Sequence, residues 1–291
     1  MSITDSFRYR VLKPMLINPP YSNFKRSLLK NLLSGFKIIK RNNLSPLKKE
    51  IISNLDSHGC ATTDVDRLHT MNRAAFENFH SIVNLSLNLG FSVCGKIENM
   101  SESVKKIILD KIKLDSKKNY KINVTELFNR EVLYSYSNSD FFINVVNNYL
   151  QVPSKLSYCE IIFDHNIHNK KQEIETQMFH RDHNGVLFLK IFTYLTDVRI
   201  ENGPFSYIEN SHRAENLQLK KTHIRNNIRY DNSDIYTKLK KSENVFTGNS
   251  GSIIFSDTTG LHRGYLPDEK FSRLLISATY EPVNSFFSFS E

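Results

Sequence analysis

The sequence predicts an α+β protein built on a double-stranded β-helix, that is, a jelly-roll or cupin-like barrel, with helical support on its N-terminal side. Helical patterns occupy residues 46–150, whereas strand-like apolar runs begin only after Pro153. Such segregation of helices from strands is typical of α+β architecture. A jelly roll is the antiparallel arrangement that protects its sheet edges and leaves a cavity between two sheets. Barrels of about 200–250 residues usually form one domain, so we expect a single domain over residues 46–291.

The first 45 residues are predicted to form a basic arm. Residues 1–50 hold eleven Lys or Arg against two acids, whereas the rest of the chain holds 28 of each. Within Phe24–Arg41, apolar side chains recur at helical spacing with basic ones mostly opposite, which predicts an amphipathic helix. Three interpretations are open for this segment: a helix packed on the barrel, a helix on a membrane surface or a transit peptide. Because the excess charge belongs to the arm, the domain itself offers no ground for nucleic-acid binding.

The first half of the domain carries the helix signals. Pro46 begins a helix over Leu47–Leu55, and Cys60–Thr63 reads as a short strand after it. The longest pattern, Arg67–Leu89, is closed by Gly90. Three further helices are predicted over Glu102–Leu114, Thr125–Tyr134 and Asp140–Leu150. None of these segments carries a catalytic constellation, so we expect them to support the barrel.

The second half carries the strand signals. Five apolar runs predict strands over Ser157–Phe163, Leu187–Leu195, Phe205–Ile208, Ser252–Phe255 and Phe271–Tyr280. Between the first two lies a polar segment in which His165 and His168 are spaced for metal binding. Its Asn-rich and Lys-rich composition is more typical of a surface turn.

A long polar insertion over Ala214–Thr247 interrupts the barrel, which is expected to resume at Gly248. Loops longer than about 12–15 residues in compact domains are usually functional lids or disordered segments. The insertion is rich in bases, among them Lys220, Lys221, Arg225 and Arg229. This charge indicates a lid over an anionic substrate, and a solvated basic loop without substrate contact is the alternative.

The chemistry centres on His180-Arg181-Asp182, a His-x-Asp motif that leads into the apolar run of the second strand. On a β-strand, residues i and i+2 point to the same face, so His180 and Asp182 can hold one ion together. His262, which follows the strand-like run Ser252–Phe255 and a turn, is the candidate third ligand. Two histidines and a carboxylate on one side of a metal form the facial triad of non-haem Fe(II) oxygenases. A capping role for Asp182 and a core position for His262 are the structural alternatives.

Further motifs follow these ligands in a fixed order. They are Tyr194-Leu195-Thr196-Asp197-Val198, Asn202-Gly203-Pro204-Phe205 and Asn210-Ser211-His212, and then Arg273 eleven residues after His262. With the His-x-Asp motif, this order resembles the phytanoyl-CoA dioxygenase family of Fe(II)/2-oxoglutarate-dependent oxygenases. The resemblance covers about residues 155–285, and it implies the double-stranded β-helix fold.

The resemblance also implies the cofactors and the reaction. His180, Asp182 and His262 would bind Fe(II), and Arg273 would bind the distal carboxylate of the co-substrate 2-oxoglutarate. O₂ would then be used to hydroxylate a small-molecule substrate, with succinate and CO₂ as co-products. Related halogenases replace the triad carboxylate with a small residue, so Asp182 favours hydroxylation. A buried structural ion pair is the competing role for Arg273.

The strand after the motif offers further candidates for co-substrate binding. Lys190, Phe192 and Tyr194 share one face of this strand, and Thr193 lies on the other. Phe192 falls where the family often places a ring near the co-substrate, and either face is able to line the site. Gly264 departs from the family, many members of which carry a polar residue shortly after the distal histidine.

Two other functions remain open. One is a cupin-like metalloenzyme that does not use 2-oxoglutarate, such as an isomerase, because one fold hosts many reactions. The other is a non-catalytic barrel that acts as a binding module. The three cysteines, Cys60, Cys94 and Cys159, have no metal-type spacing and indicate reduced thiols in a cytoplasmic protein. No apolar run reaches the roughly 20 residues of a membrane span.

Overall fold

The computed structural model describes residues 39, 41, 44–70, 72–114, 121–166, 175–182, 187–213, 219, 221–224, 227–239 and 242–283. The arm helix predicted over residues 24–41, apart from Ile39 and Arg41, lies outside these residues, as does His168. None of the helices among them is long and apolar enough to cross a membrane.

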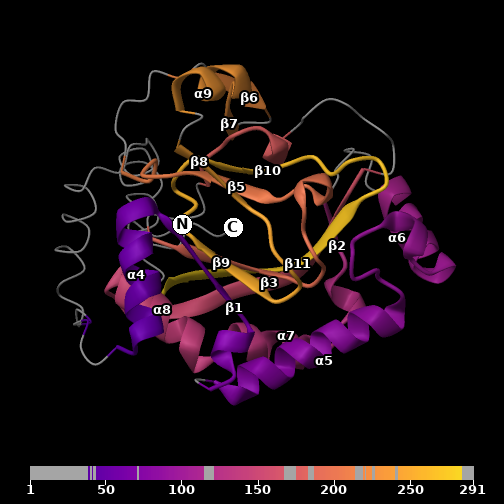
Figure 1. Cartoon of the computed structure of the whole chain (residues 1–291), viewed down its shortest axis with the longest axis horizontal. Helices are drawn as coiled ribbons and strands as arrows, with labels where there is room; N and C mark the ends of the chain where they lie inside the picture. The colour runs from indigo at the N-terminus through magenta and orange to yellow at the C-terminus, as the bar shows by residue number, and fades with distance from the viewer. Residues whose placement is uncertain are drawn as a thin grey trace, which may run out of the picture.

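A six-stranded antiparallel sheet forms the centre of the molecule (Figure 1). Its strands, in spatial order, are β1 (Cys60–Asp64), β9 (Ser252–Ser256), β4 (Leu189–Tyr194), β11 (Ser272–Pro282), β3 (Ser154–His165) and β2 (Lys121–Asn123). The register places Ser277 of β11 opposite Phe192 on one side and Glu160 on the other. Because opposite residues in an antiparallel pair share a face, the register determines which side chains meet above this sheet.

A smaller sheet covers one face of the central sheet (Figure 1). It has the order β10 (His262–Gly264), β5 (Phe205–Ile208) and β8 (Glu243–Phe246). Apolar side chains from both sheets form one cluster between them, which includes Ile162, Tyr194, Phe205, Tyr207, Phe246, Ile254 and Leu275. Two facing antiparallel sheets with an interior between them confirm the predicted jelly-roll architecture.

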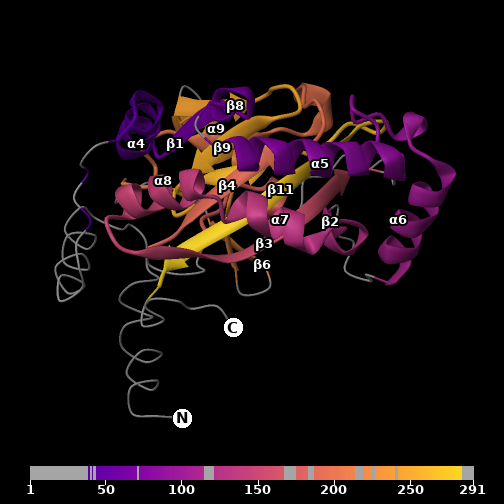
Figure 2. The same ribbon diagram turned by 90° about the horizontal axis from the view of Figure 1, so that it is seen from below.

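Helices cover the opposite face of the central sheet (Figure 2). They are α4 (Pro46–His58), α5 (Arg73–Leu89), α7 (Arg130–Ser137) and α8 (Asp140–Leu150), while α6 (Glu102–Leu114) lies beyond the β2 edge. The predicted helix over residues 67–89 begins later, because the Asn72 side chain caps it by accepting a hydrogen bond from the Ala75 amide at 3.0 Å. In the same way Asn129 starts α7, so residues 125–127 form only a 3₁₀ turn.

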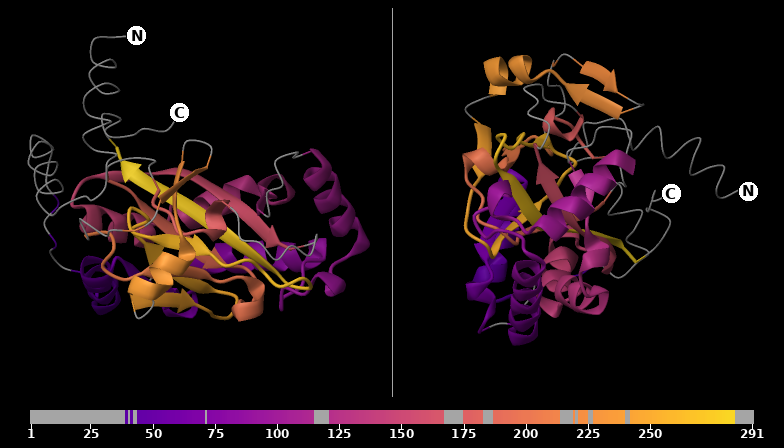
Figure 3. Two further views of the ribbon diagram at one scale, coloured as in Figure 1. Left: turned by 90° about the horizontal axis from the view of Figure 1, so that it is seen from above. Right: turned by 90° about the vertical axis from the view of Figure 1, so that its right-hand side faces the viewer.

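The insertion packs on the outer face of the smaller sheet (Figure 3). It contains β6 (Lys221–Ile224), β7 (Asn227–Tyr230) and α9 (Asn232–Leu239). The described residues of its apolar cluster are Phe179, Ile208, Leu219, Tyr230, Ile235 and Leu261. The barrel resumes earlier than Gly248, because Phe246 of β8 pairs with Phe205 and packs between the sheets. The insertion is therefore shorter than predicted.

Candidate metal centre and adjoining cavity

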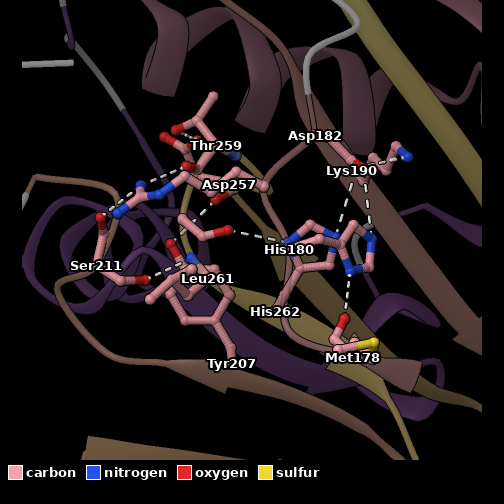
Figure 4. Close-up of polar contacts among 12 residues, drawn as sticks. Met178, His180, Asp182, Lys190, Tyr207, Ser211, Asp257, Thr259, Leu261 and His262 are labelled. Atoms are coloured by element: carbon pink, nitrogen blue, oxygen red, sulfur yellow. Dashed lines mark hydrogen bonds and ion pairs between the residues drawn. The ribbon is translucent and has the colours of Figure 1, made fainter. Parts of the chain in front are cut away.

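The structure brings the three predicted metal ligands together between the two sheets (Figure 4). One nitrogen or oxygen atom from each of His180, Asp182 and His262 lies within 4.8 Å of the others. The backbones of the two histidines exchange hydrogen bonds, each amide donating to the other's carbonyl at 3.0 Å. These two hydrogen bonds hold His180, which lies before β4, next to His262 of β10.

Each histidine is oriented by a backbone carbonyl. Nδ1 of His180 lies 2.9 Å from the Met178 oxygen, and Nδ1 of His262 lies 3.0 Å from the Gly260 oxygen. A carbonyl only accepts, so Nδ1 carries the proton in both rings and the Nε2 lone pair is left for an ion. The two Nε2 atoms lie 3.8 and 3.6 Å from the Asp182 carboxylate. Ligands at about 2.1 Å from one ion are about 3–3.5 Å apart, so the donor set fits a divalent cation after a small closure.

The charges of the triad also suit a cation. Burial, together with the neighbouring histidine, lowers the pKa of His180 well below its ordinary value, and burial lowers the pKa of His262 to about 4. Burial alone would raise the pKa of Asp182, but Lys190 and the two histidines hold it well below its usual range. Two neutral imidazoles and one carboxylate therefore face the same point at neutral pH.

Lys190 is the residue closest to the triad on β4. Its Nζ lies 2.7 Å from the Asp182 carboxylate, and its side chain is only 13% exposed. Burial would lower the pKa of Lys190, but Asp182 raises it above its ordinary value. Phe192 lies on the same face of β4, whereas Thr193 lies on the other and shares a 2.9 Å hydrogen bond with Tyr136 of α7. The structure thus brings Lys190 and Phe192 to the site and does not bring Thr193 there.

A buried carboxylate that the sequence analysis missed braces the turn before His262. Asp257 accepts hydrogen bonds of 2.5 Å from the hydroxyls of Thr259 and Tyr149 (Figure 4 labels Asp257 and Thr259). The Thr258 carbonyl in this turn accepts the Asp182 amide at 2.8 Å. An Asp followed by two threonines and a glycine is a turn signal, but its link to Asp182 is visible only in three dimensions.

A second set of contacts holds the same turn from the opposite side. Arg181 is buried, and its guanidinium donates hydrogen bonds to the carbonyls of Ser211 at 2.8 Å and Thr259 at 2.7 Å. The Ser211 hydroxyl accepts the Leu261 amide at 2.7 Å. Gly260 packs so closely on Tyr207 that a Cβ there would lie 1.9 Å from the tyrosine oxygen. The turn therefore requires glycine at this position.

Arg273 lies at the other end of the same cavity. It is 2% exposed, and its Nε donates to the Asp164 carboxylate at 3.1 Å, as does Nη2. Burial would lower the pKa of Arg273, but Asp164 raises it. The Nη1 atom is buried and has no hydrogen-bond partner among the described residues. One edge of the guanidinium is therefore in an ion pair, and one donor remains for a ligand. A Cβ at Gly264 would lie 3.1 Å from Nη2, so the glycine leaves room for this group.

A cavity of about 160 Å³ connects the triad to Arg273. Its floor is the face of the central sheet that carries Lys190 and Phe192, and it continues over β3 to Glu160 and Tyr158. Sequence analysis missed these two residues, together with Lys121 and Ser277, because only strand register assigns them to this face.

Other sequence candidates lie elsewhere. Lys220 and Arg225 fall outside the described residues, and the side chain of Lys221 is likewise not described. The backbone of Arg229 forms an isolated antiparallel β-bridge with His180, so β7 lies next to this candidate ligand. His165 is buried against Phe163 at the end of β3 and is not part of the ligand group.

The chain was compared with family models, curated sequences and solved structures. No family model and no curated sequence matches the chain. Among solved structures, EctD from S. alaskensis with bound Fe is similar over 85% of this chain and 81% of its own, with 13% identity and a TM-score of 0.50. The alpha ketoglutarate dependent epimerase SnoN of nogalamycin biosynthesis covers 81% of each chain at 12% identity and a TM-score of 0.49. HygX from Streptomyces hygroscopicus, with nickel and 2-oxoglutarate bound, covers 83% of this chain and 88% of its own at 13% identity and a TM-score of 0.45. The chain shares the jelly-roll fold with EctD.

Proposed function

We propose that the protein is an Fe(II)/2-oxoglutarate-dependent dioxygenase that hydroxylates a small molecule. The observation that carries this proposal is the pairing of two sites in one cavity. The His-Asp-His donor set lies at one end, and the unsatisfied Nη1 donor of Arg273 lies at the other. A metal ion and a dicarboxylate need these two groups, one to chelate and one to anchor the far carboxylate.

The residues have distinct roles in this proposal. Nε2 of His180, Nε2 of His262 and the Asp182 carboxylate hold Fe(II), and Nη1 of Arg273 holds the distal carboxylate of 2-oxoglutarate. When bound, the metal and the oxo acid supply the activation of O₂, with succinate and CO₂ as co-products. Lys190 keeps Asp182 ionised and offers its ammonium group to the co-substrate, and the Phe192 ring packs beside it.

The finer assignment rests on the motifs of the sequence. Their order supports a place in the phytanoyl-CoA dioxygenase-like family, and the Fe bound in EctD is consistent with that choice. Hydroxylation is favoured over halogenation because Asp182 occupies the third ligand position. The amine of Lys121 in the cavity suits a substrate that carries an acidic group.

A metalloenzyme that does not use 2-oxoglutarate, such as an isomerase, is the second candidate. The ion pair between Arg273 and Asp164 favours it, because a guanidinium already neutralised by a carboxylate attracts a second carboxylate less strongly. The Nη1 atom, which has no hydrogen-bond partner among the described residues, favours the oxygenase.

Anaerobic titration separates the two candidates. Fe(II) and then 2-oxoglutarate are added while the weak visible metal-to-ligand charge-transfer band is recorded, and we expect the band to appear. A protein that binds Fe(II) but shows no band on addition of 2-oxoglutarate would be assigned to the second candidate.

A further inference from the structure

The cavity contains a carboxylate that iron and 2-oxoglutarate leave unused. Glu160 of β3 is half-buried in the cavity wall, and one of its oxygens accepts a 2.9 Å hydrogen bond from the Asn123 amide. Among the described residues it forms no ion pair within 4.0 Å. Burial raises the pKa of Glu160 above its usual value. Lys190 and Lys121 offset part of this rise, but the contact that holds the carboxylate in place comes from a neutral amide.

Lys121 of β2 provides the opposite charge at the same opening. It also lines the cavity, and it likewise forms no ion pair with a described residue. Part of the Lys121 side chain is exposed, but burial of its amine lowers the pKa of Lys121, and Asp164 offsets part of that effect. The register places Lys121 opposite Asp164, two rows along the sheet from Glu160. The two side chains therefore contribute one carboxylate and one amine to the wall of the same cavity.

The remaining charges of the cavity compensate one another. Lys190 pairs with Asp182, Arg273 with Asp164, and Arg263 lies 3.6 Å from Glu243. Under the proposed function, Fe(II) and the 2-oxoglutarate dianion also cancel. A substrate with a net charge would leave that charge uncompensated in a confined site, which is unfavourable.

We propose that Glu160 and Lys121 bind the two ends of a zwitterionic substrate, a free α-amino acid. Glu160 receives its protonated amine and Lys121 its carboxylate. The reaction at this substrate rests on the proposed function, whereas the binding does not require it. Tyr158, 41% exposed at the same opening, forms the wall past which the amino acid would enter.

Calorimetric titration tests the binding. The full-length protein, loaded anaerobically with Fe(II), is titrated with each of the common L-amino acids, with and without 2-oxoglutarate. The N-acetyl and methyl-ester derivatives of any amino acid that binds are then titrated in the same way. We expect at least one free amino acid to bind, and both derivatives to bind about tenfold or more weakly, because each loses one charged contact.

One variant assigns the contact with the amine, and a second variant is its control. Glu160→Gln keeps the shape and the Asn123 contact but removes the charge, so we expect it to bind the free amino acid about tenfold more weakly and no longer to discriminate against the N-acetyl form. Glu77→Gln, at an exposed position of α5, is the matched control and should bind as the unaltered protein does. If no free amino acid binds, or if Glu160→Gln keeps the discrimination, the inference is wrong. If an amino acid binds but 2-oxoglutarate produces no charge-transfer band, the proposed oxygenase function is wrong and the amino-acid site stands.

Discussion

At the scale of single residues, the site depends on how each donor is held. Both histidines present Nε2 because a carbonyl two residues earlier in the chain accepts the Nδ1 proton. Asp182 is anionic because Lys190 compensates the burial of its charge. Arg273 divides its donors between Asp164 and the cavity. Each candidate ligand is thus oriented or kept in its charge state by a neighbouring group that does not itself belong to the triad.

Replacing the triad carboxylate tests the assignment of the centre. Asp182→Ala should abolish succinate formation or reduce it greatly, because one of three ligands is lost and Lys190 is left buried beside the metal. Succinate is measured after aerobic incubation with Fe(II) and 2-oxoglutarate. Near-normal turnover in this variant would mean that the triad is misassigned.

Replacing the arginine tests the far end of the cavity. Arg273→Leu should raise the KM for 2-oxoglutarate by about 10-fold to 100-fold, the equivalent of about 1.5–3 kcal/mol for a charged hydrogen bond. Fe(II) affinity should change much less, because the ligands stay. The KM is obtained from succinate formation and Fe(II) affinity from anaerobic titration. An unchanged KM would leave Arg273 with only its ion pair to Asp164.

At the scale of elements, one turn joins the two sheets. The turn from Asp257 to Gly260 connects β9 of the central sheet to β10 of the smaller sheet. Its carbonyls hold the Asp182 amide and the His262 ring, and Asp257 fixes its shape from inside. The turn therefore positions both Asp182 and His262.

Weakening this turn should loosen the metal centre. Asp257→Asn keeps the shape but replaces a charged acceptor of two short hydrogen bonds, so we expect a loss of about 1–3 kcal/mol in unfolding free energy and weaker Fe(II) binding. Tyr149→Phe removes only one of the two donors and should show a smaller effect on both. Chemical denaturation and anaerobic Fe(II) titration measure the two quantities. Normal Fe(II) affinity in Asp257→Asn would show that the turn does not position the ligands.

At the scale of the whole molecule, the metal would add a link between two sheets that also meet through an apolar cluster and the turn from Asp257 to Gly260. His262 belongs to the smaller sheet, while Asp182 leads toward β4 of the central sheet and contacts Lys190 on it. A ligand that binds only the folded state stabilises it by mass action.

Metal loading should therefore raise the melting temperature. At a free Fe(II) concentration about 100-fold above Kd, the stabilisation is about 2.7 kcal/mol, which corresponds to several degrees in a domain of this size. Anaerobic thermal denaturation with and without Fe(II) measures the shift. Asp182→Ala should lose the shift, whereas His69→Ala, a histidine outside the ligand group, should keep it. An equal shift in both variants would place the ion elsewhere.

Much of the fold and the metal site was predictable because the underlying signals are local. The His-x-Asp spacing puts two ligands on one side of an extended segment, and Pro153 separates helical from strand patterns. Boundaries were missed where a side-chain cap overrode the apolar period, as at Asn72. The end of the insertion was missed because β8 is recognisable only by its pairing with β5.

The sequence by itself determined the fold class and the three candidate ligands, because periodicity and motif order are properties of the linear chain. Tertiary structure decided which face of β4 lies toward the candidate ligands, and so brought Lys190 and Phe192 to the cavity and not Thr193. It also placed Asp164, 109 residues away in sequence, against Arg273 through the register of β3 and β11. Contacts of this kind depend on strand pairing, and a shift of one residue would turn every side chain to the other face.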